Sequence, residues 1–505
     1  MRRYRSGLIV AALALAALPS SAEAKRDGAI MSFDGTKIVY SFFPAEGLRP
    51  HQRAPTILVG HGYGQSRDTS ESSSSEELFG QIGVGPLRKR GYNVLTWDTR
   101  GFGDSGGKVM VDGPQTEGRD VKALISFVAK QREAQLDHRG DPRLGMAGAS
   151  YGGGIQLVSA GIDRRIDAIV PDIAWHHLLS SLYKDQTFKS GWINALVGAG
   201  EASSFGSGLG GGPAGVQMGD QDPHITHAFT NGTATGTVPP EDVKWFESRG
   251  PGALVHKIRI PTLLTQGTAD TLFTLREAIE NYTILRKNHV PVKMLWFCGG
   301  HGVCLTKAGK AGHLQKDTLA WFDRYLKRNR RVNTGPRFEW VDQTGAWRFG
   351  GDYPLRYGAS LTGLGTGTLA LSPGQTSGAA IAAGPAATAV SIPIDRPSRT
   401  VRIVGTPGFA LTYSGTAAPG VTRLFAQLVD PASGLVLGNQ VTPIPVTLDG
   451  HPHTIRRPLE PVAFTAAAGT QLKLQVIAGT NVYAPQRSSG LVSFSRVAVR
   501  LPVVR

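Results

Sequence analysis

Residues 148–152 read Gly-Ala-Ser-Tyr-Gly, a pattern that constrains the fold more than any other stretch of the chain. In G-x-S-x-G a strand turns sharply into a helix and leaves the serine hydroxyl exposed at the edge of a sheet. A side chain at either glycine would collide with the strained backbone of the serine. The flanking apolar segments fit a strand before the motif and a helix after it. The pattern predicts Ser150 as a candidate nucleophile, and the alternative is an ordinary Gly-rich loop.

Short apolar runs alternate with helical patterns on both sides of this motif. The runs lie at residues 55–60, 92–97, 166–171, 261–266 and 292–297, and the helix candidates at about 79–90, 117–131, 272–285 and 312–328. Such alternation is typical of a doubly wound α/β sheet. We expect this domain to occupy residues 25–329. Its regular pattern fades between about 172 and 251, which predicts an insertion that covers the active site as a lid.

The composition changes beyond Asn329. Lysine nearly vanishes, with Lys473 the only one, while Gly, Pro, Thr and Val dominate. Apolar and polar residues alternate at 471–476 and 497–501, as they do in strands with one buried face. Several such strands between Gly and Pro turns predict an all-β sandwich or jelly roll over residues 330–505. A chain of 505 residues is long enough for this two-domain division.

The first 24 residues have the character of a secretory signal peptide. Three arginines precede an apolar run from Leu8 to Leu18, and Ala22-Glu23-Ala24 resembles a cleavage site before Lys25. This run and every later one are too short to span a bilayer, so we expect an exported protein without a membrane anchor. The net charge of +16 is dispersed along the chain, which argues against nucleic-acid binding and favours a solvated basic surface.

A serine hydroxyl becomes a good nucleophile only beside a base that a carboxylate orients. In this type of fold the partners follow in the order serine, acid, histidine, each on a loop after a later strand. Asp270 comes directly after the run at 261–266 and is the predicted acid. Its alternative role is to cap the next helix, and Asp172 is the main competitor because it follows an earlier strand.

Five histidines follow Asp270, and His301 is the predicted base. It comes after the run at 292–297 within Gly-Gly-His-Gly, a loop that suits a mobile imidazole. The other four are placed less well, at the start of a strand, in a helix or in the β region: His289, His313, His451 and His453.

Cys298 and Cys304 bracket His301 at equal distance on each side. In an exported protein two such cysteines are expected to form a disulfide, which would pin the loop that carries the base. The alternatives are two reduced thiols or a metal site that includes His301. We expect no metal and no cofactor.

An oxyanion formed during acyl transfer needs preorganised hydrogen-bond donors. The backbone N–H of Tyr151, the residue after the nucleophile, is the first predicted donor. The second should come from the loop after the run at 55–60, where Tyr63 offers its N–H or its phenol. The alternative role of Tyr63 is an aromatic wall of the pocket.

These residues together resemble the X-Pro dipeptidyl-peptidase and cocaine-esterase group of serine hydrolases. The resemblance rests on residues 148–153, the segment Asp98 to Gly107, Asp270, His301, and the stretches 424–431 and 469–476 of the β region. It implies an α/β-hydrolase sheet with a lid, followed by a C-terminal jelly-roll sandwich. It also implies Ser150, Asp270 and His301 as the catalytic triad and a donor role for Tyr63 in the oxyanion hole.

The predicted function is therefore hydrolysis of an ester or peptide bond in a small-molecule substrate. Dipeptidyl-peptidases need a carboxylate for the free amino terminus of the peptide, and the lid region offers Asp172, Asp185, Glu201, Asp220 and Asp222. One alternative is a carboxylesterase without peptidase activity. Another is a non-catalytic protein that binds carbohydrate through aromatic side chains of the β region, such as Trp340, Trp347 and Tyr483.

Overall fold

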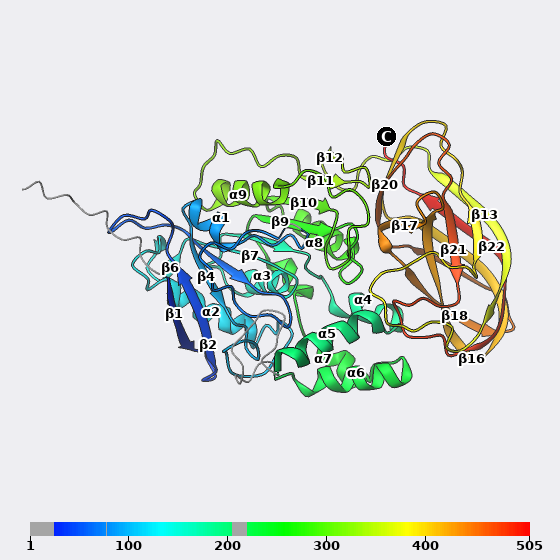
Figure 1. Cartoon of the computed structure of the whole chain (residues 1–505), viewed down its shortest axis with the longest axis horizontal. Coiled ribbons are helices and arrows are strands. Elements are labelled where there is room, and N and C mark those ends of the chain that lie inside the picture. Colours follow the sequence, from blue (N-terminus) through cyan, green and yellow to red (C-terminus); the bar gives the residue numbers. More distant parts are fainter. Residues whose placement is uncertain (1–24, 77, 205–219) are drawn as a thin grey trace, which may run out of the picture.

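The computed structural model describes residues 25–76, 78–204 and 220–505. The predicted signal peptide, residues 1–24, lies outside this range. An α/β part and an all-β part lie side by side, and a group of helices runs along one edge of the α/β part towards the all-β part (Figure 1). Within the described residues no helix combines the length and the apolarity that crossing a membrane requires.

The α/β part is built on one ten-stranded sheet with the order β1-β2-β4-β3-β7-β8-β9-β10-β11-β12. Neighbours from β4 to β11 are parallel, and the strands at both edges are antiparallel. Every residue of the parallel strands is buried, which explains their continuous apolar runs. The strands are β1 Arg26–Met31, β2 Lys37–Phe43, β3 Thr56–Gly60, β4 Asn93–Trp97, β7 Leu144–Ala149, β8 Ala168–Asp172, β9 Thr262–Gly267, β10 Val292–Phe297, β11 Phe338–Val341 and β12 Trp347–Gly350. A small hairpin, β5 Leu136–His138 with β6 Asp141–Pro142, lies outside this sheet.

Helices cover both faces of this sheet. One core contains side chains of α2, α3 and α8 together with Leu58 and Met146. The other contains side chains of α1 and α9 together with Ile57 and Ala147, which point to the opposite face because side chains alternate along a strand. These helices are α1 Val84–Lys89, α2 Glu117–Val128, α3 Tyr151–Ile162, α8 Leu275–Lys287 and α9 His313–Tyr325. The sheet with helices on both faces confirms the predicted α/β fold class.

The segment between β8 and β9 is the insertion expected from the loss of periodicity, and it is largely helical. It contains α4 Leu178–Leu182, η1 Lys184–Gln186, α5 Ser190–Ser204, α6 Pro223–Thr235, α7 Pro240–Glu247 and η2 Gly252–Lys257. The sequence showed no clear helical period here. Four of these helices, α4, α5, α6 and α7, line a shared pocket and carry many small or polar residues, so none displays a simple apolar stripe.

The ten-stranded sheet extends beyond the domain boundary that the composition placed at residue 329. Strand β11 pairs with β10, and β12 pairs with β11, so residues up to Gly350 continue the sheet. Trp340, which the carbohydrate-binding alternative placed in the β region, is a buried residue of β11. Tyr483 is buried as well and Trp347 is partly buried. The aromatic surface on which that alternative depended is therefore not present at Trp340 and Tyr483.

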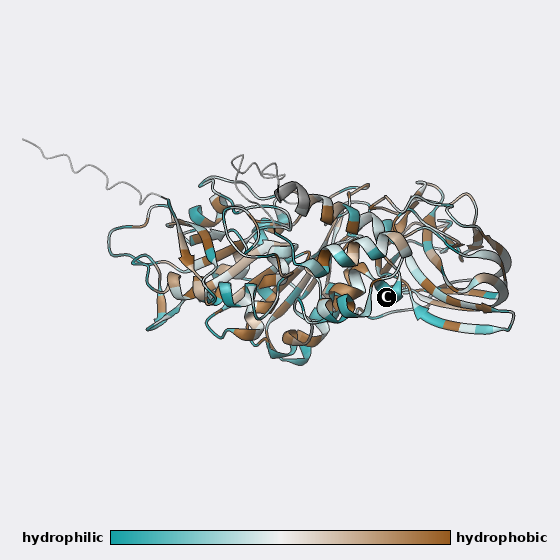
Figure 2. Ribbon diagram, turned by 90° about the horizontal axis from the view of Figure 1, so that it is seen from below, coloured by the Kyte–Doolittle hydropathy of each residue, from teal (hydrophilic) through white to brown (hydrophobic). Residues whose placement is uncertain are grey.

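The remaining residues form the predicted all-β domain, which curves into a nearly closed, barrel-like sheet (Figure 1). The central strand β16 pairs with five others, and apolar and polar residues alternate along several strands (Figure 2). The elements are β13 Leu361–Leu371, β14 Val390–Pro393, β15 Val401–Gly405, β16 Gly408–Asp430, β17 Leu435–Val436, η3 Leu437–Asn439, β18 Thr442–Asp449, β19 His453–Pro458, β20 Val462–Ala466, β21 Lys473–Ile477 and β22 Ser489–Leu501.

Candidate active site

Ser150 occupies the sharp turn between β7 and α3. Its backbone has φ 58° and ψ −115°, a conformation that side-chain-bearing residues rarely adopt. The turn is held because Ser150 N–H donates to the carbonyl of Asp172 at 3.0 Å. A Cβ on Gly152 would lie 2.3 Å from the carbonyl oxygen of Gly60, so only glycine fits between the helix and β3. The strain sets the serine side chain at the carboxyl end of the sheet.

Three of the predicted side chains meet at this edge. His301 Nε2 lies 2.7 Å from Ser150 Oγ, and His301 Nδ1 lies 2.8 Å from Asp270 Oδ2. Because a carboxylate oxygen can only accept, Nδ1 carries the proton and Nε2 presents its lone pair to the serine hydroxyl. The arrangement suits transfer of the hydroxyl proton to the imidazole.

Asp270 is fully buried, yet both of its carboxylate oxygens have donors. Oδ1 accepts backbone hydrogen bonds from Leu272 at 3.0 Å and Phe273 at 2.9 Å, and Oδ2 accepts a further one from the backbone of His301 at 3.2 Å. These donors compensate the carboxylate for its lost hydration, and the buried ammonium group of Lys189 donates to the carbonyls of Thr271 and Leu272 in the same turn. The turn after β9 thus supplies donors to the carboxylate in addition to the imidazole of His301.

Aromatic rings enclose His301 on two sides. The indole of Trp192 and the ring of Phe273 lie nearly perpendicular to the imidazole, with centroids 5.8 and 5.0 Å away. Trp192 Nε1 donates to the hydroxyl of Thr271 at 2.9 Å, which ties helix α5 to the loop of Asp270. No sequence motif marks Trp192, because its role depends on how the lid folds back over the sheet.

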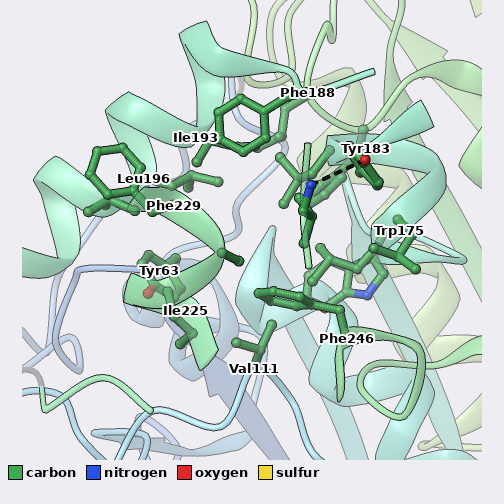
Figure 3. A pocket seen from close by; sticks show the side chains of 18 of the residues that line it. Tyr63, Val111, Trp175, Tyr183, Phe188, Ile193, Leu196, Ile225, Phe229 and Phe246 are labelled. Carbon is green, nitrogen blue, oxygen red and sulfur yellow. Dashed lines mark hydrogen bonds between the residues drawn. The ribbon is translucent and has the colours of Figure 1, made fainter. Parts of the chain in front are cut away.

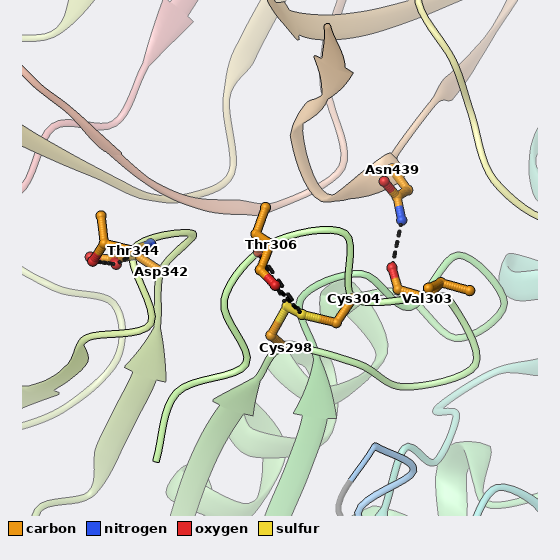
Figure 4. Close-up of a disulfide and its surroundings, with 7 residues drawn as sticks. All are labelled: Cys298, Val303, Cys304, Thr306, Asp342, Thr344 and Asn439. Carbon is orange, nitrogen blue, oxygen red and sulfur yellow. Dashed lines mark hydrogen bonds between the residues drawn. A yellow bond between two sulfur atoms is a disulfide. The ribbon is translucent and has the colours of Figure 1, made fainter. Parts of the chain in front are cut away.

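The disulfide between Cys298 and Cys304 is formed, as the sequence predicted. It closes the loop that carries His301 (Figure 4). Both sulfurs are committed to this bond, so the alternatives of free thiols and of a metal site with His301 do not hold.

The two predicted oxyanion donors lie beside each other. Tyr151 is the first residue of α3, where a backbone N–H has no acceptor within the helix. The ring of Tyr63 contacts the ring of Tyr151 edge to face, 5.5 Å between centroids. The phenol of Tyr63 donates to Gln221 Oε1 at 3.0 Å, whereas the phenol of Tyr151 donates to Glu117. Burial raises the pKa of the Tyr151 phenol, which keeps it neutral.

Asp172, the competing acid, has a different position. Its side chain accepts a hydrogen bond from Thr265, its other oxygen Oδ2 is buried without a partner, and burial raises its pKa well above the usual range. A carboxyl group whose pKa is raised by burial is less suited to stabilise an imidazolium by charge. Its backbone carbonyl, rather than its carboxyl group, contacts Ser150.

The remaining lid carboxylates are engaged elsewhere or not described. Asp185 pairs with Arg457, Asp220 lies 3.7 Å from Lys108, and Asp222 caps helix α6. The side chain of Glu201 lies outside the described part of the chain.

An apolar pocket opens beside Ser150 and encloses about 100 Å³ (Figure 3). Lid helices and loops of the sheet contribute its walls, and the described lining contains no charged side chain. Its apolar lining residues include Val111, Trp175, Leu196, Ile225, Phe229 and Phe246. The few polar atoms include Ser150 Oγ and the phenol of Tyr183, which accepts from Val238 N–H at 3.2 Å. The site thus combines a polar catalytic edge with an apolar binding cavity.

One cluster of potential metal ligands occurs among the described residues: His313, Asp317 and Glu339. Lys293 already occupies it, because its ammonium group donates to both Asp317 and Glu339. The cluster is a partly buried ion network between helix α9 and the strands β10 and β11.

Comparison with protein families places the site in context. The family model described as X-Pro dipeptidyl-peptidase (S15 family) matches residues 34–303, which is just over half of the chain and includes Ser150, Asp270 and His301. Two curated relatives match over 140 residues. One is an uncharacterised protein of Pseudomonas aeruginosa, 26% identical over 27% of this chain and 34% of its own length. The other is an uncharacterised 31.7 kDa protein of Escherichia coli, 36% identical over 27% of this chain and 42% of its own. The chain thus spans less than half the length of these relatives.

Solved structures share the fold over nearly the whole chain. A CocE/NonD family hydrolase from Staphylococcus aureus has a TM-score of 0.67 and 14% identity, with coverage of 95% of this chain and 94% of its own. An α-amino acid ester hydrolase also has a TM-score of 0.67, at 13% identity and coverage of 95% and 96%. At such identities the likeness concerns the fold: an α/β domain followed by an all-β domain.

Proposed function

The chain belongs to the X-Pro dipeptidyl-peptidase (S15) family, and on that premise we propose that it is an exported serine esterase whose triad is Ser150, His301 and Asp270. The family match and the shared fold support a serine hydrolase of the X-Pro peptidase and esterase group. The observation that carries the narrower proposal is the apolar cavity next to Ser150, whose described lining offers no carboxylate for a substrate amine.

Catalysis begins when His301 Nε2 takes the proton of Ser150 as the oxygen attacks the substrate carbonyl. Asp270 keeps the imidazole in the required tautomer and stabilises the imidazolium that forms. The imidazolium then protonates the leaving alkoxide. Water, deprotonated by the same imidazole, attacks the acyl-enzyme and releases the acid and the free serine.

The tetrahedral intermediate places its oxyanion next to the start of α3. The backbone N–H of Tyr151 has no acceptor within the helix, and the helix N-terminus favours negative charge there. Tyr63 is the candidate for the second donor. Its phenol is oriented by Gln221, so a bound substrate would have to compete with that hydrogen bond.

The acyl group of the substrate would occupy the apolar cavity. Burial of a methylene contributes about 0.8 kcal/mol, so each added carbon of a chain that fits should favour binding. A free ammonium group in the same cavity would lose its hydration without a described partner to replace it. This contrast predicts ester substrates with an uncharged, apolar acyl group.

The test compares p-nitrophenyl butyrate with Gly-Pro-p-nitroanilide. We expect turnover of the ester and none of the anilide, and a loss of at least about 10⁴-fold in kcat for Ser150→Ala. Ser159→Ala is the matched control, because Ser159 lies on the same helix, is fully buried and has no hydrogen-bond partner for its hydroxyl. Activity of Ser150→Ala equal to that of Ser159→Ala would contradict the proposed nucleophile.

Dipeptidyl-peptidase activity is the second candidate, and the family match favours it. Serine-dependent release from the anilide would establish it and would direct attention to the lid carboxylates. A matched pair of substrates distinguishes the esterase from the dipeptidyl-peptidase: butyryl and α-aminobutyryl esters differ only by an amine. A preference for the amine-free ester is the expected result.

Export is a separate part of the proposal. It is supported by the Arg-rich, apolar first 24 residues and by the disulfide between Cys298 and Cys304, since disulfides persist in oxidising compartments. Expression of the full chain in a secreting host followed by N-terminal sequencing is the measurement. A mature protein that begins at Lys25 is expected, and an unprocessed protein retained in the cytosol would contradict it.

A further inference from the structure

The β domain reaches the loop of Asp270 at several successive positions. Gln440 Nε2 donates to the carbonyl of Asp270 at 2.6 Å, and the hydroxyl of Thr271 donates to the carbonyl of Ile381. Thr274, the next residue but two, donates to Glu460 at 2.7 Å. The loop that presents the acid is thus hydrogen-bonded to a domain more than one hundred residues away in the sequence.

The loop of His301 is held by the same turn of the β domain. Asn439 Nδ2 donates to the carbonyl of Val303 at 3.1 Å, next to the disulfide (Figure 4). Asn439 and Gln440 are adjacent residues, and each contacts one of the two loops. A single short segment therefore touches the supports of both the acid and the base.

The turn is shaped for this contact. Asn439 and Gln440 are 5% and 6% exposed, so their amides are removed from competing water. Gly438 has φ 62°, and a Cβ at this position would lie 2.7 Å from the carbonyl oxygen of Thr268. Only glycine permits the approach, which brings η3 directly against the start of the acid loop.

Glu460 secures the next part of the same contact. It is buried and accepts hydrogen bonds from Thr274 and from the ammonium group of Lys184. Although burial opposes its ionisation, Lys184 and Thr274 hold the pKa of Glu460 at about 2, so it is charged at neutral pH. The lid, the acid loop and the β domain meet at this residue.

We propose that Asn439 and Gln440 are positioning residues of the active site: they fix the distance between the Asp270 and His301 loops, so that the β domain acts in catalysis without touching substrate. The inference rests on the proposed triad. A carboxylate held only by its own turn would still bind the imidazole of His301. The distance between that imidazole and the hydroxyl of Ser150 would, however, vary. A displacement of about 1 Å in such a geometry costs as much as 100-fold in rate.

The test uses Gln440→Met, which retains the length of the side chain and removes its donors. Gln343→Met is the matched control, because Gln343 Nε2 donates across the same domain boundary to Thr465 at the same 2.6 Å. We expect kcat on p-nitrophenyl butyrate to fall about 10- to 100-fold in Gln440→Met with KM changed less than about threefold. In Gln343→Met we expect a comparable fall in Tm and no change in kcat.

A double-mutant comparison separates positioning from loss of structure. In the Asp270→Ala variant the carboxylate is absent. Adding Gln440→Met to this variant should therefore lower kcat by less than about twofold. Asn439→Gly keeps the positive φ of 57° and removes the donor to Val303, and a smaller loss in kcat is expected.

Equal kcat values for Gln440→Met and Gln343→Met would overturn the inference. An undiminished effect of Gln440→Met in the Asp270→Ala background would overturn it as well, because Gln440 would then act elsewhere. The proposed function fails by a different result, full activity of Ser150→Ala, so the two outcomes are distinguishable.

Discussion

Asp172 is the last residue of β8, and Asp270 lies in the turn after the neighbouring parallel strand β9. Both are buried, yet their surroundings differ. Asp270 has three backbone donors and the imidazole of His301. Asp172 has one hydroxyl donor, and its second oxygen has no partner. A buried carboxyl group can therefore have donors on both oxygens or be left with an unpaired oxygen, and the loop that follows the strand decides which.

The largest effect on kcat should come from replacing each of the two acids separately by asparagine. Asp270→Asn removes the charge and favours the wrong imidazole tautomer, and we expect kcat to fall about 10⁴-fold. Asp172→Asn, the control of equal burial, should change kcat less than about threefold. Steady-state kinetics on p-nitrophenyl butyrate measure both. Similar losses for the two variants would mean that the acids share one role.

Breaking the disulfide should have the next largest effect, because it restrains the loop beside Asp270 and has no counterpart at Asp172. Replacement of both Cys298 and Cys304 by alanine opens a short loop, and a loss of about 2 kcal/mol in unfolding free energy is expected. We also expect kcat to fall about tenfold while KM is retained, since a looser loop misplaces the imidazole. Urea unfolding monitored by fluorescence measures the first effect. An unchanged kcat would show that the loop keeps its position without the covalent link.

The pH dependence of stability should separate the two carboxyl groups further. Burial raises the folded-state pKa of Asp172. Its contribution to the free energy of unfolding is therefore full below the unfolded-state pKa and is lost as pH rises through the folded-state pKa. Asp172→Asn does not titrate, so its Tm relative to the unmodified protein should increase between pH 5 and pH 9. Scanning calorimetry at matched ionic strength tests this. A Tm difference that stays constant over this range would mean that Asp172 is already charged in the folded protein at pH 5.

The smallest effect concerns the single donor to Asp172. Thr265→Val removes the hydroxyl that donates to its carboxyl group, which should cost about 1 kcal/mol of unfolding free energy and leave kcat unchanged. A substantial loss of kcat would show that the end of β8 affects the geometry at Ser150.

Much of this comparison could be anticipated from the sequence. The strand and helix around Ser150, and the order of the acid and base, follow from local patterns of apolar residues. What distinguished Asp270 from Asp172 was the chain order alone. Their donors could not be read from the sequence, because backbone N–H groups are the same for every residue and only the fold of the turn directs them.

Other features depend on contacts between distant segments. The lid helices lack a single apolar stripe because they enclose a shared cavity, and Trp192 meets His301 only after the lid folds back. The composition change at residue 329 suggested a domain boundary that lies before β11. A strand of four residues is too short to be recognised by a change in composition. Gln440 gives no sequence signal, because its partner is a backbone carbonyl.

The position of β11 has a practical consequence for any attempt to shorten the chain. Trp296 of β10 is fully buried, and its ring contacts Phe338 of β11 at 4.8 Å between centroids. A protein cut at Asn329 would leave β10 as an open, apolar edge strand, which offers its backbone to other molecules. Such a fragment should aggregate, so an isolated catalytic unit would have to extend through Gly350.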